Sequence, residues 1–266
     1  MTTDVNGLTT AYADVPAAPA VDDSPAPLLV GEAQPAGLGR IGGPVIVTGG
    51  SSGLGQAVAA AVTAAGGVPI VLDVQPPEGD VAFVPVDLSD PDAAVEAVRA
   101  AVELAGPPVG VVTAAGTDKC GRLEDVAFSD WTRVIAVNLI GTAAVVKAAL
   151  PYLRESGGRV VTVASTLGIK AVSDATAYCA SKFGVVGFTR ALAAETAGEI
   201  GVTLLIPGGM QTHFFDDRPD QYKPGPDAKL NDPARVADTI VFALSQPAGV
   251  ELRELVVTSS WETSWP

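Results

Sequence analysis

The sequence predicts an α/β fold in which one doubly wound parallel sheet lies between two layers of helices. From Pro44 onward, short apolar segments alternate with longer helical segments, which is typical of strand–helix–strand units. Segments such as residues 45–47 are apolar at every position, as expected for strands buried on both faces. A chain of 266 residues is long enough for one such three-layer αβα domain.

The predicted elements follow one another in a regular order. We expect strands at residues 45–47, 68–72, 81–86, 110–112, 159–164, 202–206 and 254–257. We expect helices at residues 53–65, 91–104, 129–135, 139–154, 175–197 and 233–244. Helix-start signals stand at Asp90-Pro91 and Asp232-Pro233, because proline is favoured at the first helical position. The paired glycines Gly66-Gly67 end the first helix.

Composition excludes several classes of function. The net charge of −14, from 16 basic and 30 acidic residues, argues against nucleic-acid binding, which needs a basic surface. Two cysteines and one histidine in no ligand spacing predict no metal site. We expect no membrane span, because Gly, Pro or charged residues interrupt every long apolar run, and no secretory signal. The default prediction is a cytoplasmic protein.

Residues 1–40 differ in composition from the rest of the chain. They contain five prolines and many alanines, without helical or strand periodicity. We interpret residues 1–40 as a flexible extension and residues 41–266 as one domain. An alternative role, covering a neighbouring subunit, stays open.

A glycine-rich turn joins the first predicted strand to the first predicted helix. Glycines there allow a tight turn and let backbone N–H groups and the helix N-terminus approach a pyrophosphate. Asp73 ends the second strand, 24 positions after Gly49, where a carboxylate can bind both ribose hydroxyls and repel the extra phosphate of NADP. This pattern predicts a dinucleotide site that prefers NAD(H) over NADP(H). Its turn residues are Gly49, Ser51, Ser52, Gly53, Leu54 and Gly55.

The spacing Thr-Gly-x-x-x-Gly-x-Gly over residues 48–55, together with Tyr-x-x-x-Lys at residues 178–182, resembles the short-chain dehydrogenase/reductase family in its single-domain branch. The resemblance covers roughly residues 43–258. It implies a Rossmann-type fold, transfer of hydride between a nicotinamide cofactor and a small-molecule alcohol or ketone, and a homodimer or homotetramer.

The resemblance also assigns cofactor contacts outside the glycine turn. These lie after the third, fourth and sixth strands, and they are Asp87, Leu88, Ala115, Gly116, Pro207, Gly208, Met210 and Thr212. One segment departs from the family pattern. Thr113-Ala114 stands where the family has two asparagines, so the bracing that these amides provide is in doubt.

Four residues form the predicted catalytic group. Tyr178 and Lys182 are four positions apart on one predicted helix and therefore share a face. A nearby ammonium favours the phenolate, so Tyr178 can exchange a proton with an alcohol or carbonyl. Ser165, 13 positions before Tyr178, has the family's spacing for the hydroxyl that holds the substrate oxygen. Asn138 matches the family's asparagine, which implies a water bound beside Lys182. Tyr178 and Lys182 also belong to the cofactor site.

Three cations in the loops near this group predict an anionic substrate. They are Lys170, His213 and Arg218, and cations over a cleft can attract an anion. Alternatively the substrate is a hydrophobic ketone, and these side chains pair with aspartates close in sequence, namely Asp118, Asp174, Asp216 and Asp217. Two other functions stay open as well: a non-catalytic NAD-binding sensor on the same fold, and an enzyme that retains NAD while modifying a sugar.

Overall fold

The computed structural model describes residues 39–262. The predicted extension at residues 1–40 therefore lies, except for its last two residues, outside the described part of the chain. The described residues contain a seven-stranded sheet with strand order β3-β2-β1-β4-β5-β6-β7, in which every neighbouring pair is parallel. The prediction of a Rossmann-type parallel sheet is confirmed.

The strands follow the predicted order with small shifts at their ends. They are β1 Pro44–Thr48, β2 Val68–Asp73, β3 Ala82–Pro85, β4 Gly110–Thr113, β5 Arg159–Val163, β6 Gly201–Pro207 and β7 Glu254–Val257. The central strands have no exposed position, and all residues of β4 and β5 are buried. Continuous apolar sequence is what burial of both faces requires.

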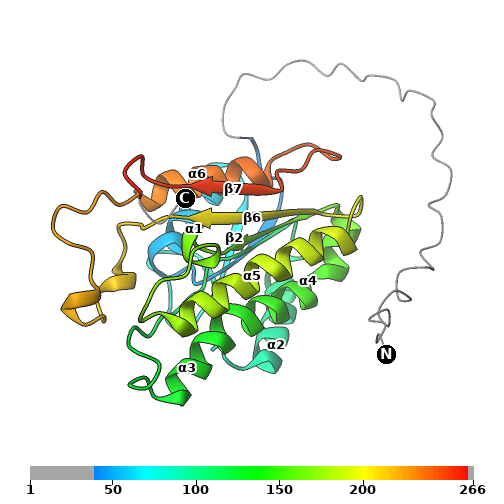
Figure 1. Ribbon diagram of the computed structural model, residues 1–266. Coiled ribbons are helices and arrows are strands. Elements are labelled where there is room, and N and C mark those ends of the chain that lie inside the picture. The colour runs from blue at the N-terminus through cyan, green and yellow to red at the C-terminus, as the bar shows by residue number, and fades with distance from the viewer. Residues whose placement is uncertain (1–38, 263–266) are drawn as a thin grey trace, which may run out of the picture. The chain divides into compact units, whose positions relative to one another are not determined.

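Helices cover both faces of the sheet (Figure 1). They are α1 Gly53–Ala64, α2 Pro91–Ala105, α3 Phe128–Ile135, α4 Thr142–Ser156, α5 Thr176–Glu195 and α6 Pro233–Leu244. Successive side chains of a strand point to opposite faces: Val45 and Val47 pack towards α1 and α6, whereas Ile46 packs towards α2 and α4. Asp90 caps α2 with its carboxylate, and Pro91 begins that helix as predicted.

One long helical stretch differs from the prediction of two separate helices. A π-helical segment, η1 Ala136–Gly141, joins α3 to α4 without a break. The hydroxyl of Thr142 donates to the carbonyl of Asn138 at 2.9 Å. A π-helical turn inserts an extra residue into the helix and often marks a functional position, and here that position is Asn138.

By length and composition alone, the stretch Phe128–Ser156 could cross a membrane, the one such stretch among the described residues. Gly141, Lys147 and Pro151 interrupt its apolar sequence, as expected, although they do not end the helix. In the fold it packs against α2 and α5. A core helix of a folded domain can have the same length and apolar composition.

Candidate active site

The predicted site residues follow the carboxyl ends of parallel strands and therefore meet at one edge of the sheet. The turn after β1 depends on its glycines. Gly49 and Gly53 have φ values of +68° and +51°, which favour glycine. A Cβ at Gly49 would lie 2.7 Å from the Cα of Ala115, and a Cβ at Gly55 would collide with the Gly49 carbonyl.

The N-terminus of α1 has free backbone donors. Ser52, its N-cap residue, makes no side-chain hydrogen bond to the first turn, whereas Asp90 and Asp232 cap α2 and α6. The hydroxyl of Ser51 instead donates to the carbonyl of Gln75 at 2.5 Å. Uncapped N–H groups with the positive end of the helix dipole form an anion site. The turn therefore fits the pyrophosphate of a dinucleotide.

Asp73 lies at the end of β2 and is held beside this turn. Its carboxylate accepts hydrogen bonds from the backbone N–H groups of Ser51 at 3.1 Å and Gln75 at 3.2 Å. None of the ion pairs found within residues 39–262 involves Asp73. A fixed carboxylate with no cation partner fits a ribose diol and is unfavourable for an additional phosphate.

After β3, Asp87 accepts a hydrogen bond from the backbone N–H of Ser89 at 2.9 Å and pairs with Arg133 at 3.2 Å. The Ser89 N–H and the Arg133 charge lower the pKa of Asp87. Leu88 is buried beneath η1, where a Cβ at Gly141 would lie 2.6 Å from the Leu88 carbonyl oxygen. The ion pair had no signal in the sequence, because Arg133 is 46 positions away.

The segment after β4 is braced without the two missing asparagines. The hydroxyl of Thr48, at the end of β1, accepts a hydrogen bond from the N–H of Ala115 at 3.1 Å. The hydroxyl oxygen of Thr113 is buried and has no hydrogen-bond partner within residues 39–262. Thr48 thus supplies one link between the central strands. A Cβ at Gly116 would lie 3.7 Å from the Lys182 Nζ, so this glycine faces the predicted catalytic group.

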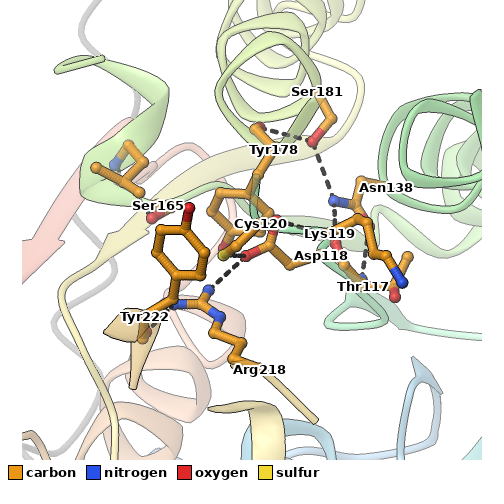
Figure 2. A network of polar contacts seen from close by, with 11 residues as sticks. Thr117, Asp118, Lys119, Cys120, Asn138, Ser165, Tyr178, Ser181, Arg218 and Tyr222 are labelled. Atoms are coloured by element: carbon orange, nitrogen blue, oxygen red, sulfur yellow. Dashed lines mark hydrogen bonds and ion pairs between the residues drawn. The ribbon is translucent and has the colours of Figure 1, made fainter. Parts of the chain in front are cut away.

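Asn138 is fully engaged at the π-helical turn. Its Oδ1 accepts from the Thr117 N–H at 2.8 Å, and its Nδ2 donates to the Thr117 carbonyl at 2.9 Å and to the Ser181 hydroxyl at 3.0 Å (Figure 2). The Ser181 hydroxyl donates in turn to the carbonyl of Tyr178. The network ties the loop after β4 to α5. Sequence reasoning missed Ser181 and Thr117.

Lys182 is 4% exposed, and its ammonium donates to the carbonyl of Val163 at 2.9 Å. Burial lowers the pKa of Lys182 to about 8. The Nζ lies 5.7 Å from the centre of the Tyr178 ring, so the predicted pair does share one face of α5.

Burial raises the pKa of Tyr178 to about 12, while a hydrogen bond with Ser165 acts in the opposite direction. The expected lowering of this pKa is therefore outweighed by burial in the protein without a ligand. Ser165 also accepts a hydrogen bond from the Leu167 N–H at 3.1 Å, which fixes it at the end of β5.

The segment after β6 reaches back to the glycine turn. Thr212 approaches Gly53, where a Cβ would lie 3.4 Å from the Thr212 Cβ. Pro207 ends β6, and Met210 forms a bridge with Asn231.

The same segment has a partner near the end of the described chain. Glu262 accepts a hydrogen bond from the Gly209 N–H at 3.0 Å, and a Cβ at Gly208 would collide with the Glu262 carboxylate. Glu262 was not among the predicted site residues, and it is 53 positions from Gly209.

Two of the three predicted substrate-binding cations have aspartate partners. His213, whose side chain is 87% exposed, lies 2.8 Å from Asp216, and Arg218 lies 2.6 Å from Asp118. Lys170 is exposed. This pairing agrees with the alternative that the sequence left open. Binding of substrate by these three residues stays a prediction.

An uncapped glycine turn, a strand-end carboxylate and a Ser–Tyr–Lys group at the edge of one parallel sheet are the features of a nicotinamide-dependent oxidoreductase. The family model for short chain dehydrogenases matches residues 44–223. The chain belongs to the short-chain dehydrogenase family, and it is an NAD(P)-dependent oxidoreductase.

Related sequences support this assignment to the family. The chain is 30% identical over 237 residues to the 2,5-dichloro-2,5-cyclohexadiene-1,4-diol dehydrogenase of Sphingobium indicum, covering 80% of this chain and 95% of the relative. It is also 30% identical over 224 residues to an uncharacterised oxidoreductase of Staphylococcus aureus, with the same coverage.

Solved structures show the same fold. The aldohexose dehydrogenase of Thermoplasma acidophilum superposes with a TM-score of 0.74 at 25% identity, over 83% of this chain and 93% of that chain. An NADP-bound chain from Beutenbergia cavernae, for which an NAD(P)-dependent gluconate 5-dehydrogenase activity is proposed, gives a TM-score of 0.74 at 28% identity, over 84% and 98%.

Proposed function

We propose that this protein oxidises a secondary alcohol, or reduces the matching ketone, with NAD(H) as its preferred cofactor and Tyr178 as the acid/base. One observation carries the proposal: Ser165, Tyr178 and Lys182 converge at the edge of the sheet where the glycine turn begins. The proposed preference for NAD(H) is supported by the fixed, unpaired carboxylate of Asp73.

Each side chain has a distinct part in the proposed reaction. When bound, the nicotinamide supplies the hydride donor or acceptor. Ser165 holds the substrate oxygen and stabilises its developing charge. Tyr178, whose pKa burial raises to about 12, is protonated at neutral pH and donates its phenolic proton to a ketone. In the oxidation direction the phenolate form of Tyr178 accepts the proton from the alcohol, so oxidation is expected to become faster as the pH rises and more of this form is present.

Lys182 and Asn138 support this proton transfer in the proposal. The Lys182 ammonium lies beside the Tyr178 ring and favours the phenolate once the proton has left. It also binds the nicotinamide ribose. The side-chain oxygen and nitrogen of Asn138 hold the loop after β4 against α5, which helps to keep Lys182 in place.

The substrate we propose is a small, hydroxylated and uncharged molecule. Arg218 and His213 are each paired with an aspartate, which leaves little net positive charge to attract an anion. The named relatives act on an aldohexose and on a cyclohexadiene diol, so a panel should begin with sugars, polyols and cyclic diols. We further propose a homo-oligomer that acts in the cytoplasm.

The test follows the absorbance of the reduced cofactor with alcohols and ketones, using NAD(H) and NADP(H) in parallel. The panel includes charged and neutral members matched at the reacting carbon, at low and high salt. We expect turnover, a higher kcat/KM with NAD(H), and little effect of salt on neutral substrates. Cofactor binding without turnover would favour a sensor. A cofactor that stays bound, without net reduction, would favour a sugar-modifying enzyme.

A further inference from the structure

One buried ion pair lies beside the candidate active site and takes no part in the reaction steps proposed above. Arg218, in the segment after β6, donates to Asp118, in the loop after β4, at 2.6 Å (Figure 2). The Arg218 side chain is 18% exposed and that of Asp118 is 4% exposed. Among the ion pairs found within residues 39–262, no other has both members so deeply buried.

The guanidinium of Arg218 rests on two aromatic rings. Its Cζ lies 5.3 Å from the centre of the Phe214 ring and 4.7 Å from that of Phe215. Cation–π contacts of this kind add to an ion pair where water is excluded. The Phe214 ring in turn lies 5.7 Å from the Tyr178 ring, tilted by 54°. Arg218 therefore holds an aromatic cover against the proposed acid/base.

A second tie closes the same segment. The hydroxyl of Tyr222 is hydrogen-bonded to Asp174, which lies between β5 and α5. The carbonyl of Asp174 accepts from the Gly121 N–H at 2.8 Å, and the Tyr222 carbonyl accepts from Arg218 at 3.4 Å. Three loops, after β4, β5 and β6, are thus fastened to one another over Tyr178.

We propose that Arg218 is a positioning residue for the reaction: together with Asp118 it forms a clasp that closes residues 213–222 over Tyr178 and releases them when substrate enters or product leaves. Whether residues 213–222 close over Tyr178 does not depend on the proposed alcohol–ketone reaction. The effect of that closing on turnover does rest on the proposed reaction.

The structure also explains why the clasp is able to open. The Nε of Arg218 is buried and has no hydrogen-bond partner within residues 39–262. Removing two charges from water is costly, and an unpaired buried donor adds to that cost. Opening hydrates all three groups. The closed arrangement therefore carries desolvation costs that opening relieves.

The clasp has an electrostatic consequence at Tyr178. The groups that act on this phenol are Ser165, Asp118, Arg218 and the neighbouring thiol of Cys179, and the Lys182 ammonium lies over its ring. Asp118 raises the pKa of Tyr178, whereas Arg218 lowers it. In the intact pair the two effects oppose each other. Removing one member leaves the other uncompensated, and the two removals act in opposite directions.

The first test is hydrogen exchange of backbone amides in the variants Arg218→Gln and Asp118→Asn, without any ligand. We expect amides of residues 213–222 to exchange about tenfold faster in both, while those of the central strands stay protected. The matched control is Arg190→Gln, which breaks an exposed ion pair with Glu254 away from the site, and we expect it to exchange like the native protein. Exchange at native rates in both clasp variants would overturn the proposal.

The second test is the pH dependence of alcohol oxidation. We expect the apparent pKa assigned to Tyr178 in the pH–rate profile to rise by about half a unit in Arg218→Gln. We expect it to fall by a similar amount in Asp118→Asn. The KM for the alcohol should rise about tenfold in both, with the KM for NAD unchanged. If the ion pair had only a structural role, the two variants would shift this apparent pKa in the same direction or not at all. That result would refute the positioning role.

One further variant keeps the outcomes distinct. Arg218→Lys keeps the charge but loses the planar stack on Phe214, so we expect a native pH limb with faster exchange at residues 213–222. If Asp118→Asn does not fold, Arg218→Lys and Arg218→Gln carry the test alone. Absence of turnover in the native protein would contradict the proposed function, and hydrogen exchange would still decide on the clasp.

Discussion

Lys182 should reduce the stability of the protein in the absence of ligand. Its ammonium is 4% exposed, and burial lowers its pKa from 10.5 to about 8. By linkage, that difference corresponds to about 3 kcal/mol at pH values below 8. This contribution is destabilising, because the charged form of Lys182 is less favourable in the folded state than in the unfolded state.

Replacing Lys182 with Met removes this cost and keeps a similar volume. The carbonyl of Val163 loses its hydrogen bond at 2.9 Å, which returns about 1 kcal/mol of the gain. The net expectation is a stabilisation of about 2 kcal/mol at neutral pH. For a domain of this size, that raises the Tm by roughly 4–8 °C, while turnover is lost.

The assay is thermal unfolding of the ligand-free protein at two pH values. The cost of the buried ammonium is present in full below pH 8 and disappears as the pH rises towards 10.5. We therefore expect the advantage of Lys182→Met at about pH 7 to have nearly vanished at about pH 10. Lys147→Met, at an exposed position of α4, serves as the control. A variant that melts at or below the native temperature at neutral pH, or whose advantage does not depend on pH, would refute this reasoning.

Three other substitutions test separate parts of the argument. Tyr178→Phe should lower kcat about a thousandfold because the proton donor is lost, with NADH affinity within about threefold by fluorescence titration; a mild loss of rate would point to another acid/base. Asp73→Ala should narrow the preference for NAD over NADP about tenfold by removing a fixed negative charge, as measured by kcat/KM ratios; an unchanged ratio would mean that Asp73 does not select the cofactor. Thr113→Val should raise stability by about 1–2 kcal/mol in urea, because the buried hydroxyl has no partner; a loss of stability would contradict the absence of a partner.

Much of the fold could be predicted because burial leaves a local trace in the sequence. Continuous apolar segments located the parallel strands, and Asp90-Pro91 located the start of α2. The π-helical turn at Asn138 could not be predicted in this way. One extra residue in a helix hardly changes hydrophobic periodicity, so the sequence predicted a gap between two helices where the chain continues.

The same distinction applies to the site, between residues fixed by one helix and residues brought together by loops. Tyr178 and Lys182 were predictable because four residues on one helix fix their relation. Pairings across loops were not. Arg218 is 100 positions from Asp118, and its partner depends on how two loops fold back over the sheet. Sequence proximity suggested only that aspartates were near, and it correctly indicated Asp216 for His213.

The contact between Glu262 and Gly209 places a natural optical probe beside the segment after β6, where cofactor contacts are predicted. Trp261 precedes Glu262 and is 72% exposed. Tryptophan emission overlaps the absorption of reduced nicotinamide, so energy transfer from this side chain should report NADH binding without any label. Replacing Trp261 with Phe would separate its signal from those of Trp131, which lies on α3, and Trp265. A change in the Trp261 emission would also report when the contact between Glu262 and Gly209 breaks.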